Sequence, residues 1–115
     1  MLFRSIEIGT NEPGEIEILS SMLAPTHGLI TNIGKEHLEK LIDLDGVEKE
    51  ETALFQWLER HGGTRLININ DERLKTFAQG PRYITYALDN PADLHATWHL
   101  SDQGFAEMEI GRAHV

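Results

Sequence analysis

The chain has 115 residues, of which 40% are hydrophobic and 25% charged, so it suits one small globular domain or a section of a larger one. Its formal net charge of −9, without a basic run, argues against nucleic-acid binding, and the absence of cysteine excludes disulfide scaffolds and thiolate metal sites. No apolar run is long enough to span a membrane, and the N-terminus lacks the features of a signal peptide.

The N-terminal part of the chain predicts a strand, a helix and a second strand. Residues 2–8, LFRSIEI, have the composition of a β-strand. A helix should follow, with Asn11 as its N-cap and Pro13 in its first turn, and Pro25 should end it. Its apolar stripe consists of Ile16, Leu19, Met22 and Leu23. Residues 28–33, GLITNI, form the second predicted strand.

A second long helix is predicted after the loop GKEHLEKLIDL. Asp45 and Glu48, three residues apart, have the spacing of a capping box at its start. The helix should run to about His61 and stop at the two glycines that follow, because glycine is a common C-terminal signal. One face carries an apolar stripe that Glu51 interrupts, formed by Val47, Leu54, Phe55 and Leu58.

Two further strands are predicted at residues 64–69 and 82–88, with a short helix between them that Asn70 or Asp71 caps. The resulting order is β-α-β-α-β-α-β. Strands that alternate with helices favour an α/β fold, with a mostly parallel sheet and flanking helices.

The pattern changes beyond Asn90. Two β-type segments, DLHATWHLS and GFAEMEI, are joined by a turn near Gly104 and predict an antiparallel appendage. We therefore assign residues 1–90 to one domain and residues 91–108 to the start of a β appendage of that domain. Residues 109–115, EIGRAHV, match translated sequencing adapter, so we interpret them as a non-native tail and expect that the gene was cut off at this end.

Two side chains are predicted to lie beyond the carboxyl ends of strands, where ligands bind in open α/β sheets. Glu7 ends the first strand and could hold Mg²⁺, which prefers oxygen ligands; the alternative is a solvated carboxylate. His37, in the loop after the second strand, could bind a metal or polarise a phosphate; the alternative is an exposed loop histidine.

Glu51 is the third candidate, because it lies where the helical stripe calls for an aliphatic residue. A buried carboxylate is tolerable beside a cation or a metal. The alternative is a slightly rotated helix with Glu51 at the solvent boundary. His95 and His99 are four residues apart, but their segment is predicted to be a strand and no third ligand is evident, so zinc is a weak alternative there.

Four segments in series resemble the central ATPase domain of the Mur ligases: IEIGTNEPGEIEIL, GLITNIGKEHLE, DGVEKEETALF and GGTRLININDE. They are most similar to the type that adds D-alanyl-D-alanine, and the resemblance covers about residues 4–90. It implies a Rossmann-like P-loop ligase domain that is cytoplasmic and incomplete. It also implies a reaction in which ATP converts a peptide carboxylate to an acyl phosphate, which the amine of D-alanyl-D-alanine then attacks.

The resemblance implies roles for seven residues. Glu7 matches the glutamate that holds the metal shared by the nucleotide phosphates, and His37 matches the histidine that holds a second Mg²⁺ near the acyl phosphate. The remaining matches are Asn32 and Glu39 on the side of the nucleotide-linked peptide substrate, Asn68 and Asp71 on the ATP side, and Glu51.

Position 51 departs from the family, which usually has a carbamylated lysine there that supports the second metal. Glu51 would supply a carboxylate directly, although its side chain is shorter than a carbamylated lysine. We therefore expect Glu7, His37 and Glu51 to converge at one end of the sheet, with His37 and Glu51 as the catalytic pair.

The phosphate loop of the family is not found in the 115 residues, so we expect a fragment that has no ligase activity alone and binds ATP weakly at best. Two alternatives stay open. One is another ligase of the superfamily, of the folylpolyglutamate or cyanophycin type, although GTNEPGEI points away from these. The other is a non-catalytic α/β binding module.

Overall fold

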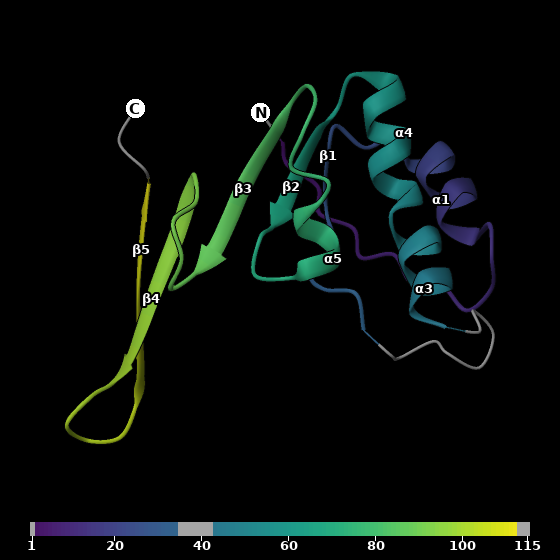
Figure 1. Ribbon diagram of the computed structural model, residues 1–115. Coiled ribbons are helices and arrows are strands. Elements are labelled where there is room, and N and C mark those ends of the chain that lie inside the picture. Colours follow the sequence, from purple (N-terminus) through teal and green to yellow (C-terminus); the bar gives the residue numbers. More distant parts are fainter. Residues whose placement is uncertain (1, 35–42, 113–115) are drawn as a thin grey trace.

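The computed structural model describes residues 2–34 and 43–112, which form a five-stranded sheet with helices gathered at one end (Figure 1). The elements, in chain order, are α1 (Glu15–Leu23), β1 (His27–Leu29), α3 (Leu44–Glu51), α4 (Ala53–His61), β2 (Thr64–Asn68), α5 (Glu72–Lys75), β3 (Tyr83–Leu88), β4 (Leu94–Leu100) and β5 (Ala106–Arg112). No helix within these residues is long and apolar enough to cross a membrane.

The strands lie side by side in the order of the chain, β1-β2-β3-β4-β5. Pairing is parallel from β1 to β4, and β4 pairs with β5 in an antiparallel hairpin. The predicted fold class, a mostly parallel sheet with helices and an antiparallel appendage, is confirmed. The strands β1, β2 and β3 lie within or close to their predicted ranges, although β1 is only 3 residues long.

A short connection joins the parallel strands β3 and β4. Asp93 fastens it, because its carboxylate accepts hydrogen bonds from the backbone N–H and the hydroxyl of Thr85, at 3.0 and 3.2 Å. The backbone N–H of Asp93 donates to the same hydroxyl, at 3.0 Å. This reciprocal bonding lets β4 start beside Tyr86 and run on in the direction of β3.

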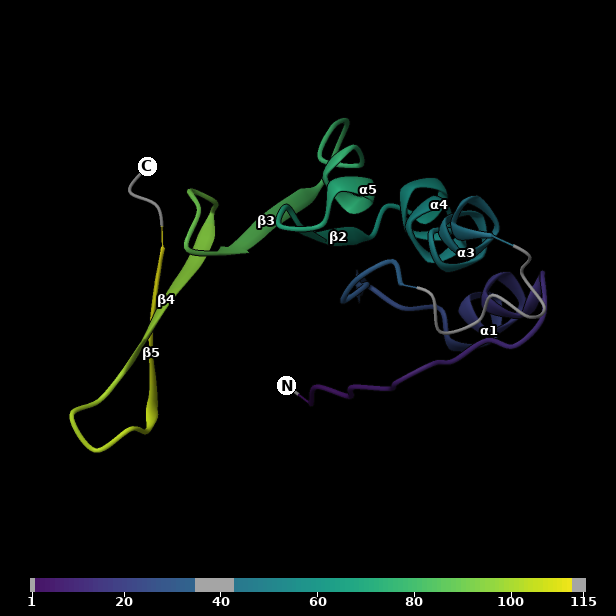
Figure 2. The same ribbon diagram turned by 60° about the horizontal axis from the view of Figure 1, so that its bottom comes forward.

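The strand predicted at residues 2–8 is wrong. This segment is not assigned as a strand and pairs with none of the five strands, and Figure 2 shows it as an extended chain apart from the sheet. Leu2 and Phe3 are 88% and 89% exposed. A β-strand needs a neighbour to receive its backbone hydrogen bonds. The composition of residues 2–8 favours a strand, but the described residues offer no partner.

The start of α1 differs from the prediction, since its N-cap is Gly14 and not Asn11. Gly14 has a φ of 93°, a backbone conformation that glycine adopts without the strain of a side chain. No side chain of α1 caps the helix, so a group from elsewhere in the fold must receive its first N–H groups. The predicted end is confirmed, because the helix stops at Ala24, just before Pro25.

The predicted second helix is divided into α3 and α4 at Thr52. The Thr52 hydroxyl donates to the backbone carbonyl of Glu48 at 2.6 Å, a local bond that competes with regular helix geometry. The predicted capping box at Asp45 is also wrong. Asp43 is the N-cap, and its carboxylate accepts from the backbone N–H of Gly46 at 2.8 Å. The predicted stop is confirmed at Gly62, which has a φ of 74°.

The core lies between α4, α1 and the β1–β2 end of the sheet. Its buried members include Ile16, Leu54, Phe55, Leu58, Ile67 and Leu74. Gly28 of β1 is buried beneath α4, and a Cβ atom at this position would lie 2.5 Å from a methyl carbon of Leu58. The absence of a side chain therefore lets the helix approach the strand closely.

Arg65 is a buried cation on β2, with 2% exposure. Its guanidinium donates to the backbone carbonyls of Phe77, Gln79 and Pro81, at 2.7–2.9 Å. These bonds fix the path of the chain from α5 into β3. The sequence pattern of the strand does not predict this role for the inward-facing arginine, because its hydrogen-bond acceptors are backbone carbonyl groups.

Candidate functional site at the carboxyl ends of the strands

Side chains just beyond β2 connect the carboxyl ends of the parallel strands. Asn68, the last residue of β2, donates from Nδ2 to the backbone carbonyl of Thr31 at 2.8 Å, and its Oδ1 accepts from the backbone N–H of Asn70 at 3.0 Å. Asn70 reaches the other way, donating from Nδ2 to the carbonyl of Leu88 at 3.1 Å and accepting from the Leu88 N–H. Three strand ends are thereby held together.

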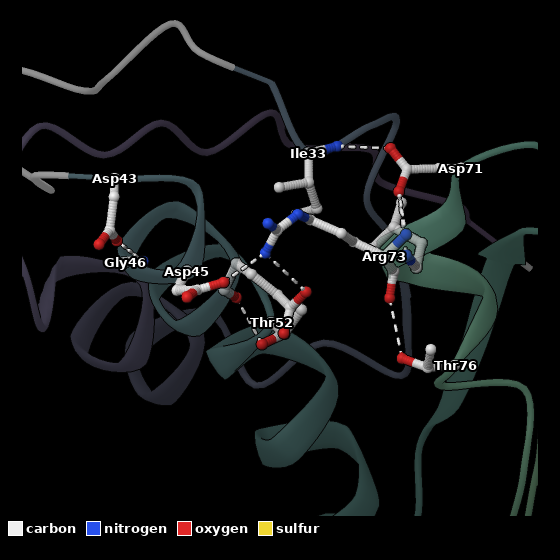
Figure 3. Close-up of polar contacts among 10 residues, drawn as sticks. Ile33, Asp43, Asp45, Gly46, Thr52, Asp71, Arg73 and Thr76 are labelled. Carbon is white, nitrogen blue, oxygen red and sulfur yellow. Dashed lines mark hydrogen bonds and ion pairs between the residues drawn. The ribbon is translucent and has the colours of Figure 1, made fainter.

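The Asp71 carboxylate accepts hydrogen bonds from two separate segments of the chain, as Figure 3 shows. Its Oδ1 caps α5 by accepting from the backbone N–H groups of Arg73 and Leu74 at 2.9 and 3.0 Å, which confirms the predicted cap. Its Oδ2 accepts from the backbone N–H of Ile33 at 2.8 Å. The carboxylate therefore ties the chain that follows β1 to the start of α5.

The Tyr86 hydroxyl donates to the carbonyl of Ile30 at 3.4 Å. Burial of the phenol, followed by the negative charge of Asp71, raises the pKa of Tyr86 above its usual value. Both effects disfavour a second negative charge at this edge of the sheet.

Arg73 joins α5 to α3. Its guanidinium lies 2.7 Å from Asp45 and 3.5 Å from Glu48, and Figure 3 shows the side chain reaching across to Asp45. The hydrogen bond to Asp45 raises the pKa of Arg73, desolvation opposes this, and the charges of Asp45 and Glu48 add to the increase. Asp45, predicted as a helix cap, instead pairs with this arginine.

The seven predicted site residues are distributed as follows. Asn68 and Asp71 lie together at the carboxyl ends of the strands, as expected, with their side-chain atoms bonded to backbone groups. Glu7 and Asn32 are exposed. His37 and Glu39 lie outside the described residues. The convergence of Glu7, His37 and Glu51 therefore stays a prediction.

The helical stripe around Glu51 is buried as predicted, with exposures of 1% for Val47, 1% for Phe55 and 0% for Leu58. Glu51 itself is half-buried at the last residue of α3. The fully buried acid is its neighbour, Glu50, with 5% exposure. An offset of three from Val47 belongs to a helical stripe as much as an offset of four does. The spacing could therefore have identified Glu50, and the prediction missed it.

Glu50 supplies the cap that α1 lacks. Its Oε1 accepts from the backbone N–H of Gly14 at 2.8 Å, and its Oε2 accepts from the N–H of Ile16 at 3.0 Å and from the hydroxyl of Thr10 at 2.7 Å. The negative charge also lies at the positive end of the α1 dipole. Glu50 thus fixes the segment that directly follows Glu7.

A magnesium site at the carboxyl ends of the strands would need several free oxygen ligands. Mg²⁺ takes hard oxygen ligands, and Glu7 offers an exposed carboxylate. Asp71 already accepts three backbone hydrogen bonds, so it fits a positioning role better than a direct metal contact. Within residues 2–34 and 43–112, no three His, Asp or Glu side chains converge as a metal site. A complete centre would need His37 or groups beyond these residues.

Comparison with known proteins gives concordant matches. The Mur ligase middle domain matches residues 3–112. The UDP-N-acetylmuramoyl-tripeptide–D-alanyl-D-alanine ligase of Bacillus subtilis is 30% identical over 102 residues, which are 89% of this chain and 21% of that protein. The enzyme of the same name from Buchnera aphidicola is 37% identical over 65 residues, which are 56% of this chain and 14% of that protein.

A crystal structure of MurF from Acinetobacter baumannii has the same fold, with a TM-score of 0.64 at 21% identity. The match covers 91% of this chain and 25% of that one. The chain spans about a fifth of the length of the Bacillus subtilis protein and a quarter of the solved structure. Because the family match extends over nearly the whole chain, the protein belongs to the Mur ligase family, with the match in the middle domain.

Proposed function

We propose that this chain is part of an ATP-dependent amide-bond ligase that adds D-alanyl-D-alanine to UDP-N-acetylmuramoyl-tripeptide in peptidoglycan synthesis in the cytoplasm. The observation that carries the proposal is the match of 89% of the chain, at 30% identity, to a ligase of that name. The two other curated relatives that match have the same name, which favours this substrate over those of the folylpolyglutamate and cyanophycin ligases.

In the proposed reaction, a terminal carboxylate oxygen of the tripeptide takes the γ-phosphoryl group of ATP, and ADP leaves. The amine nitrogen of D-alanyl-D-alanine then attacks the acyl phosphate carbon. A C–N bond forms, the C–O bond to phosphate breaks, and the nitrogen loses a proton. Such steps depend mainly on positioning and on stabilising charge.

We propose that Glu7, His37 and Glu51 hold Mg²⁺, with His37 and Glu51 at the acyl phosphate and Glu7 at the nucleotide phosphates. Bound Mg²⁺ would offset the negative charge of the phosphoryl groups. Asn32 and Glu39 would line the peptide side. Asn68 and Asp71 would stand on the ATP side. Their bonds to Thr31 and Ile33, on either side of Asn32, support a positioning role for both.

Growth of a bacterium that depends on this ligase tests the proposal. A Bacillus subtilis strain depleted of its own enzyme would receive a chimera in which this chain replaces the matching section of that enzyme. We expect the chimera to restore growth and the 115-residue chain alone to give none, because the chain spans only 21% of the relative. A folded chimera that fails to restore growth contradicts the proposal, as does growth supported by the isolated chain.

Position 51 has its own test in the same chimera. We expect ligase activity that does not depend on bicarbonate, because Glu51 brings a carboxylate without carbamylation. The variant Glu51→Lys should make the activity rise with added bicarbonate, and Lys49→Gln, on the exposed side of α3, should leave it unchanged. Bicarbonate dependence of the unmodified chimera, or its absence in Glu51→Lys, would contradict the role assigned to Glu51.

A further inference from the structure

The β4–β5 hairpin has one apolar and one polar face. Pairing sets Ala96 opposite Ile110, Trp98 opposite Met108 and Leu100 opposite Ala106. Directly paired residues point to the same face of a sheet and alternate residues point to opposite faces. One surface, here called the apolar hairpin face, is therefore formed by Leu94, Ala96, Trp98, Leu100, Ala106 and Met108. The opposite surface carries His95, Thr97, His99, Glu107 and Glu109.

The apolar hairpin face is exposed in the part of the chain that the structure describes. Trp98 is 49% exposed, Leu100 63% and Met108 59%. Single exposed apolar residues are common on protein surfaces, but a contiguous group on one sheet face indicates an interaction surface. Phe105, in the connecting turn, extends the group.

None of the helices that the structure describes covers this face. In Figures 1 and 2, α1, α3 and α4 gather near β1 and β2, and the hairpin projects away from them. β4 is paired with β3 at Leu94, His95 and Ala96, and the rest of the hairpin extends beyond β3. Burial of the apolar hairpin face against another segment would stabilise this part of the sheet further.

We propose that the apolar hairpin face is a docking surface for another segment of the same ligase polypeptide, one with an apolar side and basic flanks. This inference rests on the proposed function, which makes the chain part of a longer protein. The solved MurF chain that shares the fold has about three quarters of its length outside the matched section, so it has ample chain for this purpose.

Charge favours such a segment over a second copy of this chain. The chain carries a formal net charge of −9, so two copies of it repel each other. A segment with basic flanks would instead be attracted by the opposite charge.

Single cysteines test the proposal, because the chain contains no cysteine. Met108→Cys places a thiol on the apolar hairpin face, and the control Glu107→Cys places one on the opposite face of the same strand. Both positions are exposed here, with 59% for Met108 and 56% for the Glu107 side chain. Thiol reactivity would be measured with a water-soluble disulfide reagent, in the 115-residue chain and in a chimera whose other cysteines are serine.

In the chimera we expect the thiol of Met108→Cys to react about tenfold more slowly than that of Glu107→Cys, because packing excludes the reagent. In the 115-residue chain the two rates should agree within about twofold and should not depend on protein concentration. Equal rates in the folded chimera overturn the proposal. Protection of Met108→Cys that grows with concentration in the 115-residue chain overturns it in favour of a second copy. Neither rate requires ligase activity. A failure of this docking proposal can therefore be distinguished from a failure of the proposed function.

Discussion

At the scale of the residue, two neighbouring glutamates of α3 differ from the prediction. The sequence pattern identified Glu51 as the inward acid, whereas Glu50 is the buried one. Glu51 is half-buried at the end of α3. Glu50 is buried and receives the first N–H groups of α1. The fully buried acid of this helix is therefore Glu50, which the prediction missed, and the metal role of Glu51 stays a prediction.

Removal of the Glu50 carboxylate should destabilise the fold. Glu50→Ala leaves the N–H groups of Gly14 and Ile16 and the hydroxyl of Thr10 without their acceptor, at an expected cost of about 2–4 kcal/mol in the free energy of unfolding. Glu50→Gln keeps one acceptor oxygen and should cost less. Urea unfolding of the chimera measures both, with Lys49→Gln as the exposed control. A loss for Glu50→Ala as small as that of the control would contradict the capping role.

Tyr86 should report the charge on Asp71. In a Tyr83→Phe background Tyr86 is the one tyrosine of the chain, and its ionisation can be followed by ultraviolet absorbance. Asp71→Asn removes the negative charge and should move the pKa of Tyr86 down toward its ordinary value. An unchanged pKa would show that the two groups do not interact.

The same shift has a consequence for stability. The unfolded chain releases the Tyr86 proton near pH 10, whereas the folded chain holds it to higher pH. The folded state then binds more protons than the unfolded state, so stability should fall as the pH rises above about 10. Tyr86→Phe should remove this part of the pH dependence, which unfolding curves at several pH values would show.

At the scale of the element, the features that were predicted correctly from the sequence are those set by local signals. Gly62 ends α4 and Asp71 caps α5 as predicted, because each acts through its own backbone or through residues two and three further on. Segments whose structure depends on distant partners were mispredicted. Residues 2–8 need a neighbouring strand, and α1 is capped by Glu50, 36 residues after Gly14. Nothing in the local sequence reveals either dependence.

The close approach of α4 to β1 makes Gly28 sensitive to substitution. In Gly28→Ala, the new methyl group would meet side-chain atoms of Leu58 and Leu54 at 2.5 and 3.0 Å, so the helix would have to shift. We expect a loss of about 1–3 kcal/mol in unfolding free energy. Gly9→Ala is the matched control, because a Cβ atom there meets nothing within 4 Å. Thermal or urea unfolding that shows equal effects for both variants would contradict this packing.

At the scale of the whole molecule, the described helices are gathered at one end of the sheet. The helices cover the β1–β2 end, the apolar hairpin face is exposed, and the N-terminal segment lies unpaired within the described chain. The order of the four motifs was enough to predict the family, and the alternation of strands and helices was enough to predict the mostly parallel sheet. The metal ligands could not be assembled, because His37 lies outside the described residues and Glu7 is in a segment without a strand partner among them.

The most direct test of the ligase assignment is amide formation by the purified chimera. Given ATP, Mg²⁺, UDP-N-acetylmuramoyl-tripeptide and D-alanyl-D-alanine, it should release phosphate and yield the pentapeptide product, identified by mass. Glu7→Gln should reduce the rate by about 10²-fold or more, and Glu59→Gln, on the exposed side of α4, should not. A folded chimera that forms no amide, or that forms amide equally well after Glu7→Gln, would contradict the account.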